Sequence, residues 1–249
     1  MPKVERAIIT AAGFGSRMNP ITLDTPKPLV PVNGKPMIET TIDALRKQGI
    51  YEIYVVVGYL KEKFEYLIKK YPGVNLVENP DYETANSISS LYAARAHLAN
   101  SIVLDGDQII YNDSVFAPEF ERSGYNASYK EDGVPEWLAE IDENGIIQKV
   151  SIEGAEKGWA ISGICRWTEE DAKKLARHLE IEFKEKNNRD IYWDAVALWI
   201  YPQEYKLGIF VQEKLSDVVE VDSLEELAEI DAYYKKYIQK TKTENEKIV

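Results

Sequence analysis

Strand-like and helix-like segments alternate along residues 1–110 of this 249-residue chain. Four segments read as buried strands: VERAIIT, YEIYVVVGYL, VNLVENP and SIVLDGDQII. Segments with apolar residues at helical spacing lie between them. Helical crossovers of this kind join parallel strands. The alternation therefore predicts an α/β fold, with a Rossmann-like, mostly parallel sheet and helices on both faces.

The pattern changes after about residue 124. Alternating apolar and polar residues around turns such as Glu143-Asn144-Gly145 indicate short strands. Two helices are indicated by EEDAKKLARHLEIEFKEK and DIYWDAVALWIYP, and FVQEKLSDVVEVD reads as a last strand. This second half is therefore interpreted as a small α+β portion.

The final helix is predicted to begin with a capping box formed by Ser223 and Glu226. No low-complexity linker divides the chain, so we expect a single domain. The expected organisation is a domain over 1–240, with a core over 1–110, the α+β portion over 124–210, and a frayed tail over 241–249.

Net charge limits the classes of partner. The chain carries 42 acidic and 30 basic residues, a formal net charge of −12, which disfavours a nucleic-acid binder. A single nucleotide needs only a few donors at one place, and a divalent cation can reverse the local sign of the charge. No apolar run approaches the roughly 20 residues of a membrane span, and the first residues lack a secretory signal. The single cysteine, Cys165, predicts a reducing, cytoplasmic setting.

A loop rich in glycine and proline, residues 11–31, follows the first strand. Loops at the carboxyl ends of parallel strands can direct backbone N–H groups at a phosphate. Gly13 and Gly15 would permit close approach, Arg17 could fork across phosphate oxygens, and Lys27 could add a point charge. The alternative is an ordinary surface loop with solvated cations.

This loop resembles the signature of the sugar-nucleotide-type nucleotidyltransferases, with AAGFGSRMNPIT at 11–22 and TPKPLVP at 25–31. It departs from that signature at Thr10, where an apolar residue is usual. The resemblance implies that the chain binds a nucleoside triphosphate. It also implies catalytic roles for Arg17, near the phosphates, and for Lys27, near the phosphate that is transferred.

The base is expected to lie against the backbone that follows the first strand and against the loop NPDYETANS. Amide groups in this loop could serve cytosine, uracil or thymine. The expected nucleotide-binding residues are Ala11, Ala12, Gly13, Gly15, Asn79, Thr84, Asn86 and Asp105.

Two acidic sites end predicted strands, Asp105-Gly106-Asp107 and Asp222. Each could instead be a solvated turn or a helix-terminal charge. The resemblance implies that Asp107 and a late aspartate, here Asp222, hold Mg²⁺. A divalent cation would compensate the charge that develops on the phosphates during transfer.

Aromatic and acidic residues gather in two later segments, Glu136-Trp137 and Tyr192-Trp193-Asp194. Ring faces beside a carboxylate suit a cationic head group, so we expect these five residues to bind the acceptor substrate. The alternative is that the aromatic side chains belong to the core.

The same segments resemble the bacterial choline-phosphate cytidylyltransferases. Gly106 stands where that family is expected to have alanine. The matching stretches are Tyr129-Lys130-Glu131-Asp132, Glu136-Trp137, Ser162-Gly163 and Tyr192-Trp193-Asp194.

The resemblance implies attack of phosphocholine on CTP, giving CDP-choline and pyrophosphate, with Mg²⁺ as cofactor. The partners are then CTP and a cationic small molecule that bears a phosphate or phosphonate. Three alternatives stay open: a cytidylyltransferase for 2-aminoethylphosphonate or phosphoethanolamine, a sugar-1-phosphate nucleotidyltransferase, and a nucleotide sensor without turnover.

Overall fold

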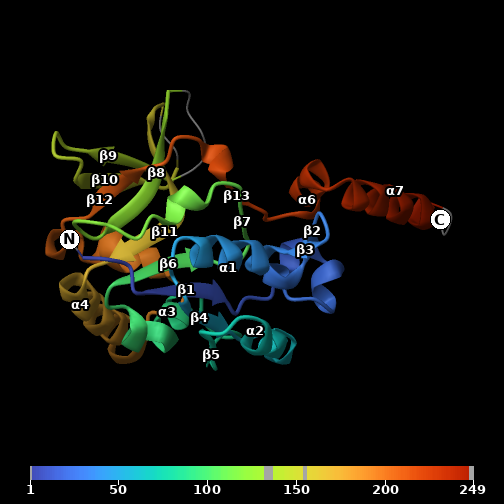
Figure 1. Ribbon diagram of the computed structural model, residues 1–249, viewed down its shortest axis with the longest axis horizontal. Helices are drawn as coiled ribbons and strands as arrows, with labels where there is room; N and C mark the ends of the chain where they lie inside the picture. Colours follow the sequence, from blue (N-terminus) through green and yellow to red (C-terminus); the bar gives the residue numbers. More distant parts are fainter. Residues whose placement is uncertain (1, 132–136, 154–155, 247–249) are drawn as a thin grey trace.

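Within the described part of the chain, nine strands form one sheet, and helix α7 projects from the body of the protein at its C-terminal end (Figure 1). The computed structural model describes residues 2–131, 137–153 and 156–246. The strands of the main sheet are β1 (Arg6–Ala11), β4 (Glu52–Val57), β5 (Val74–Glu78), β6 (Ser101–Asp105), β8 (Gly124–Lys130), β9 (Leu138–Ile141), β10 (Ile147–Ser151), β11 (Gly158–Trp167) and β12 (Gly208–Val211).

The core of the sheet is parallel, in the order β6-β1-β4-β5. Antiparallel β11 joins β6 to the second half of the chain, where it also pairs with β8 and β9. This arrangement confirms the predicted α/β class with its smaller α+β portion. The division of the chain into functional portions stays a prediction.

Helices cover both faces because the strand side chains alternate between them. Ala7, Ile9 and Ala11 of β1 face one apolar cluster together with helices α1 and α2, whereas Ile8 faces a second cluster with α3 and α4. Cys165 is buried in this second cluster. The helices are α1 (Met37–Lys47), α2 (Glu65–Lys70), α3 (Ile88–Ala94), α4 (Glu169–Glu180), α5 (Trp193–Ala195), α6 (Leu224–Ile230) and α7 (Ala232–Glu246).

Two segments predicted as single strands are each divided in two, so those predictions were wrong. SIVLDGDQII breaks after β6, and β7 (Gln108–Ile110) leaves the main sheet. FVQEKLSDVVEVD breaks after β12, and β13 (Val218–Glu220) pairs antiparallel with β7. At the first break Gly106 passes close to β1: its N–H donates to the Thr10 carbonyl oxygen at 2.8 Å, and a Cβ atom there would lie 2.9 Å from the same oxygen.

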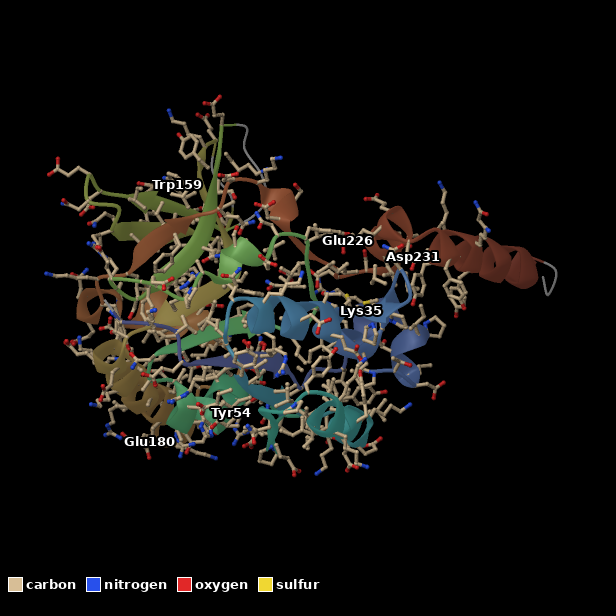
Figure 2. The ribbon with its side chains drawn as sticks, in the orientation of Figure 1. Lys35, Tyr54, Trp159, Glu180, Glu226 and Asp231 are labelled. Atoms are coloured by element: carbon tan, nitrogen blue, oxygen red, sulfur yellow. The ribbon has the colours of Figure 1, made fainter. Side chains whose placement is uncertain are left out.

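At one end of the molecule lies the β2–β3 hairpin (Pro31–Val32, Lys35–Pro36). The β7–β13 pair and helices α6 and α7 pack against this hairpin. An apolar cluster that includes Met18, Val221 and Leu227 joins these parts. Asp231, labelled near Lys35 in Figure 2, accepts a hydrogen bond from the Asn33 backbone N–H at 2.7 Å. This packing places the end of β13 beside the opening loop.

The single final helix predicted from Ser223 onward is divided into α6 and α7 at Asp231, so that prediction was wrong in extent. Helix α6 does begin with the predicted capping box, since Ser223 and Glu226 exchange hydrogen bonds with each other's backbone N–H. Helix α7 continues through Glu246 and so extends into residues 241–249, which were expected to fray. Among the described helices, none combines the length and the apolar character that a membrane crossing requires.

Candidate active site

The opening loop folds back on itself so that Gly15 lies against Lys27. Gly15 has a φ of +64°, and a Cβ atom there would lie 2.8 Å from the Cβ of Lys27. The Thr22 hydroxyl donates to the Gly15 carbonyl oxygen at 2.9 Å and holds this turn. Glycine is needed here both for its backbone conformation and for the close approach of the lysine.

Lys27 lies between two carboxylates that are far away in the sequence. Its Nζ donates to Asp107 Oδ2 at 2.6 Å and to Asp222 Oδ1 at 2.7 Å. Burial disfavours its positive charge, but the two carboxylates outweigh burial and raise the pKa of Lys27 above its ordinary value. Arg17, whose side chain is 69% exposed, donates to the same Asp222 oxygen at 2.6 Å. The four residues predicted to act together are therefore in contact.

A third carboxylate belongs to this group. Asp107, Glu220 and Asp222 each place an oxygen within 4.8 Å of the others, and we call them the carboxylate cluster. Glu220 was missed from the sequence. The alternation of a strand was the available signal, because residues two apart in VVEVD share a face and Glu220 and Asp222 are two apart.

The carboxylate cluster fits a magnesium ion. Mg²⁺ binds through carboxylate oxygens, and Asp107 Oδ1 is a buried oxygen without a hydrogen-bond partner among the described residues. Withdrawal from bulk water, together with the charges of Asp107, Asp105 and Asp222, raises the pKa of Glu220 to about 8. Such a concentration of negative charge favours a divalent cation.

Asp105 is held separately from the cluster. Its Oδ1 accepts a 2.5 Å hydrogen bond from the Thr10 hydroxyl on the neighbouring strand. Desolvation, then the nearby charges of Asp107 and Asp194, raises the pKa of Asp105 to about 8. The bond to Thr10 fixes one oxygen of this carboxylate at the start of the turn that carries Asp107.

A cavity of about 890 Å³ joins the carboxylate cluster to the predicted acceptor-binding residues. Gln108, which the sequence did not single out, lies in its wall and donates from Nε2 to the Ser162 carbonyl oxygen at 2.8 Å. Four of the predicted acceptor-binding residues line this cavity, and we call them the acceptor wall: Trp137, Tyr192, Trp193 and Asp194. One continuous space therefore connects the two predicted sites.

The aromatic residues of this wall differ in exposure. Tyr192 is 54% exposed and meets the Trp137 ring edge to face, with centroids 5.7 Å apart. Trp193 is only 1% exposed and stacks on Tyr125 at 6.2 Å. Tyr192 and Trp137 are thus available to a ligand, whereas Trp193 mainly supports the wall.

Asp194 is the acid of this wall. It is buried, and its Oδ1 accepts a 2.8 Å hydrogen bond from the Tyr125 hydroxyl, a partner that the sequence did not reveal. Burial raises the pKa of Asp194 to about 7 despite that bond. Glu136, the other predicted acid, lies outside the described residues.

Among the predicted nucleotide-binding residues, only Asp105 lines this cavity. The Asn79 amide is buried and donates to Ser89 Oγ and Ser90 Oγ at 2.9 and 3.1 Å. Thr84 and Asn86 are exposed. The other predicted residues lie along the opening loop: Ala11 and Ala12 are buried, Gly13 is exposed, and Gly15 is half-buried.

Comparison with known proteins identifies the family. Residues 7–138, more than half of the chain, match the model of the MobA-like NTP transferase domain. The chain belongs to this nucleotidyltransferase family. The nucleotidyltransferase is 40% identical over 230 residues to a 2-aminoethylphosphonate cytidylyltransferase from Lancefieldella rimae, covering 92% of each chain. It is 35% identical to a choline-phosphate cytidylyltransferase from Streptococcus pneumoniae, covering 92% of this chain and 98% of the relative.

Solved structures agree with this assignment. A CTP:phosphocholine cytidylyltransferase from Streptococcus pneumoniae superposes with a TM-score of 0.84 and 34% identity, covering 92% of this chain and 98% of that one. An inositol-1-phosphate CTP transferase from T. maritima shares the fold, with a TM-score of 0.74 and 19% identity. The predicted resemblance to the choline-phosphate cytidylyltransferases is thus confirmed.

The charged groups of this nucleotidyltransferase suit the neutralisation of polyanions. Its two histidines lie outside the cavity lining: His178 Nδ1 shares a 2.7 Å hydrogen bond with the Tyr205 hydroxyl, and His97 stacks on Tyr54 at 3.7 Å. Two cations and three carboxylates instead meet beside the cavity. Such a site can hold polyanions together with a metal.

Proposed function

We propose that the enzyme transfers the cytidylyl group of CTP to phosphocholine, giving CDP-choline and pyrophosphate. One observation carries the proposal: a single cavity is lined both by the carboxylate cluster with Arg17 and by aromatic rings with Asp194. Its relatives act on acceptors that combine a phosphate or phosphonate with a cationic end, and the lining of this cavity offers groups suited to each.

The proposed reaction is an in-line displacement at the α-phosphorus of CTP. A phosphate oxygen of phosphocholine forms the new P–O bond, and the bond to the β-phosphate breaks to release pyrophosphate. The attacking oxygen is anionic at neutral pH, so no general base is required. Rate enhancement would come from holding two polyanions together and neutralising their repulsion.

Lys27 and Arg17 supply the fixed positive charges of this site. We assign Lys27 to the phosphate groups between which transfer occurs, because it is buried beside the cluster. We assign Arg17 to the leaving pyrophosphate, because its exposed guanidinium can fork across phosphate oxygens. Asp107, Glu220 and Asp222 would hold Mg²⁺, which would supply positive charge against the same phosphates.

The choline head group would lie against Trp137 and Tyr192. Ring faces attract a quaternary ammonium, and the Asp194 carboxylate adds a net negative charge. Trp193 and Tyr125 would hold Asp194 in place. We also keep Glu136 as an acceptor-binding residue on the strength of the family resemblance.

The cytosine base would lie outside this cavity, against the backbone of residues 11–13 and the loop that carries Thr84 and Asn86. Arg189 Nη1 holds that loop through Asp81 and Thr84, at 3.0 and 3.1 Å. Asn79 would shape the loop from beneath, because its amide group is already bonded. With one cysteine in the chain, we place the enzyme in the cytoplasm.

A second candidate acceptor is 2-aminoethylphosphonate. The observation in its favour is the 40% identity to the Lancefieldella rimae enzyme, against 35% for the choline-phosphate relative. A primary ammonium donates hydrogen bonds, so it would depend more on Asp194 and less on the rings than choline does.

The test is a panel that crosses the four nucleoside triphosphates with phosphocholine, phosphoethanolamine, 2-aminoethylphosphonate and glucose 1-phosphate, scored by pyrophosphate release. We expect the highest kcat/KM for CTP with phosphocholine. Preference for glucose 1-phosphate would replace the proposal with a sugar-nucleotide activity. Absence of pyrophosphate with every pair would indicate a sensor without turnover.

A further inference from the structure

The two cations and two of the three acids of the site neutralise one another in this structure. Lys27 Nζ lies 2.6 Å from Asp107 Oδ2 and 2.7 Å from Asp222 Oδ1. Arg17 Nη2 lies 2.6 Å from the same Asp222 oxygen. These are the cations that the proposed function gives to the triphosphate, and the acids that it gives to the metal.

The lysine ammonium and a bound metal compete for the same two carboxylates. Lys27 Nζ lies within 2.7 Å of oxygens of both Asp107 and Asp222, so a metal held by these two side chains would meet a positive charge that already neutralises them. Asp222 Oδ1 already accepts two charged hydrogen bonds. Glu220, by contrast, has no ion pair among the described residues, and Asp107 Oδ1 has no hydrogen bond.

We propose that Lys27 is an internal counter-ion that weakens metal binding to the free enzyme and so couples metal loading to nucleotide loading. The inference rests on the proposed function for the identity of the metal and the triphosphate. A triphosphate offers Lys27 and Arg17 new anionic partners at the moment when the metal takes Asp107 and Asp222. Only the end of the Lys27 side chain has to move, because its Cβ is held against Gly15.

A direct consequence is that removing Lys27 tightens metal binding while it impairs catalysis. An opposite charge within about 4–6 Å of a carboxylate changes its proton affinity by one to three orders of magnitude. The same competition predicts that Lys27→Met binds Mn²⁺ about tenfold more tightly than the wild-type enzyme in the absence of nucleotide. Loss of a residue that merely helped to build the metal site would weaken binding instead.

The experiment is a titration of the metal-free, nucleotide-free full chain with Mn²⁺, in which free Mn²⁺ is followed by electron paramagnetic resonance. The control is Lys173→Met, because Lys173 is an exposed lysine of α4 that pairs with Glu169 at 2.6 Å and its loss changes the net charge equally. We expect the wild-type affinity for the control and about tenfold tighter binding for Lys27→Met. Equal or weaker binding by a folded Lys27→Met would overturn the proposal.

A second variant keeps the test decisive if Lys27→Met does not fold. Lys27→Gln removes the same positive charge but keeps a polar side chain at this position, so the same tightening of about tenfold is expected. No tightening in this variant would then refute the counter-ion role. Failure of the pyrophosphate assay with every substrate pair would overturn the proposed reaction alone, because the Mn²⁺ titration contains no substrate.

Discussion

Thr10 and Asp105 lie opposite each other on neighbouring parallel strands, and the Thr10 hydroxyl donates a 2.5 Å hydrogen bond to Asp105 Oδ1. The Thr10 carbonyl oxygen also accepts from the Gly106 N–H at 2.8 Å. One residue therefore holds both the carboxylate and the turn that precedes Asp107. This explains what a hydroxyl does at a position where related signatures have an apolar side chain.

We expect Thr10→Val to lower the free energy of unfolding by about 1–3 kcal/mol, because it leaves the Asp105 carboxylate without its donor. Turnover should fall as well, since the Asp107 turn loses one of its two supports. Urea denaturation and steady-state kinetics measure the two effects. Thr10→Ser keeps the hydroxyl and should restore most of both, and a serine variant as impaired as the valine variant would argue for packing of the Thr10 methyl group instead.

Replacing Lys27 by alanine should reduce kcat by about 100-fold or more, as expected when a fixed charge is removed from developing phosphate charge. The fold should persist, because Asp107 and Asp222 open onto the cavity and Arg17 still pairs with Asp222. Pyrophosphate release and circular dichroism check the two expectations. Lys173→Ala provides the matched control with unchanged kcat, and near-normal turnover by Lys27→Ala would remove the lysine from the mechanism.

Local sequence signals were sufficient for much of the fold. The spacing of apolar residues predicted the strands and helices of residues 1–110, and the capping box of Ser223 and Glu226 predicted the start of α6. The pairing of Asp107 with Asp222 followed from a family resemblance, and the structure places both beside Lys27.

The features that the sequence did not predict depend on pairing between strands that are far apart in the chain. No local signal in SIVLDGDQII or FVQEKLSDVVEVD indicates that their second halves leave the main sheet and pair with each other. This pairing sets Gln108 opposite Glu220 and thereby completes the carboxylate cluster. Glu220 was missed for this reason, although its spacing from Asp222 was visible.

The two neighbouring aromatic residues of the acceptor wall should respond differently to truncation. Trp193→Ala should lower the free energy of unfolding by about 3–5 kcal/mol, because the ring is fully buried and packs on Tyr125. Tyr192→Ala should leave stability within about 1 kcal/mol and raise KM for the acceptor, because that ring is half exposed. Thermal unfolding and acceptor kinetics separate the effects, and an unchanged acceptor KM in Tyr192→Ala would exclude this ring from binding.

Asp194 should make both stability and acceptor binding depend on pH. Burial raises its folded-state pKa to about 7, whereas an unfolded aspartate titrates near pH 4. Between these values the folded protein holds a proton that the unfolded chain has released. Stability contributed by Asp194 is therefore complete below about pH 4 and is lost as the pH rises to about 7. Asp194→Asn cannot ionise, so its stability relative to the wild type should rise over this interval by up to about 4 kcal/mol.

Acceptor binding should show the opposite trend, because the cationic head group is attracted to the ionised form of Asp194. We expect kcat/KM for phosphocholine to rise between pH 6 and pH 8 in the wild-type enzyme and to be flatter in Asp194→Asn. Urea denaturation at pH 5, 6, 7 and 8 gives the stability difference, and the pyrophosphate assay over the same range gives the kinetics. Tyr125→Phe serves as the comparison, since it removes the hydrogen bond to Asp194 but leaves the carboxylate in place. Parallel stability and rate profiles for wild type and Asp194→Asn would mean that Asp194 stays in one protonation state across this range and takes no part in the pH response.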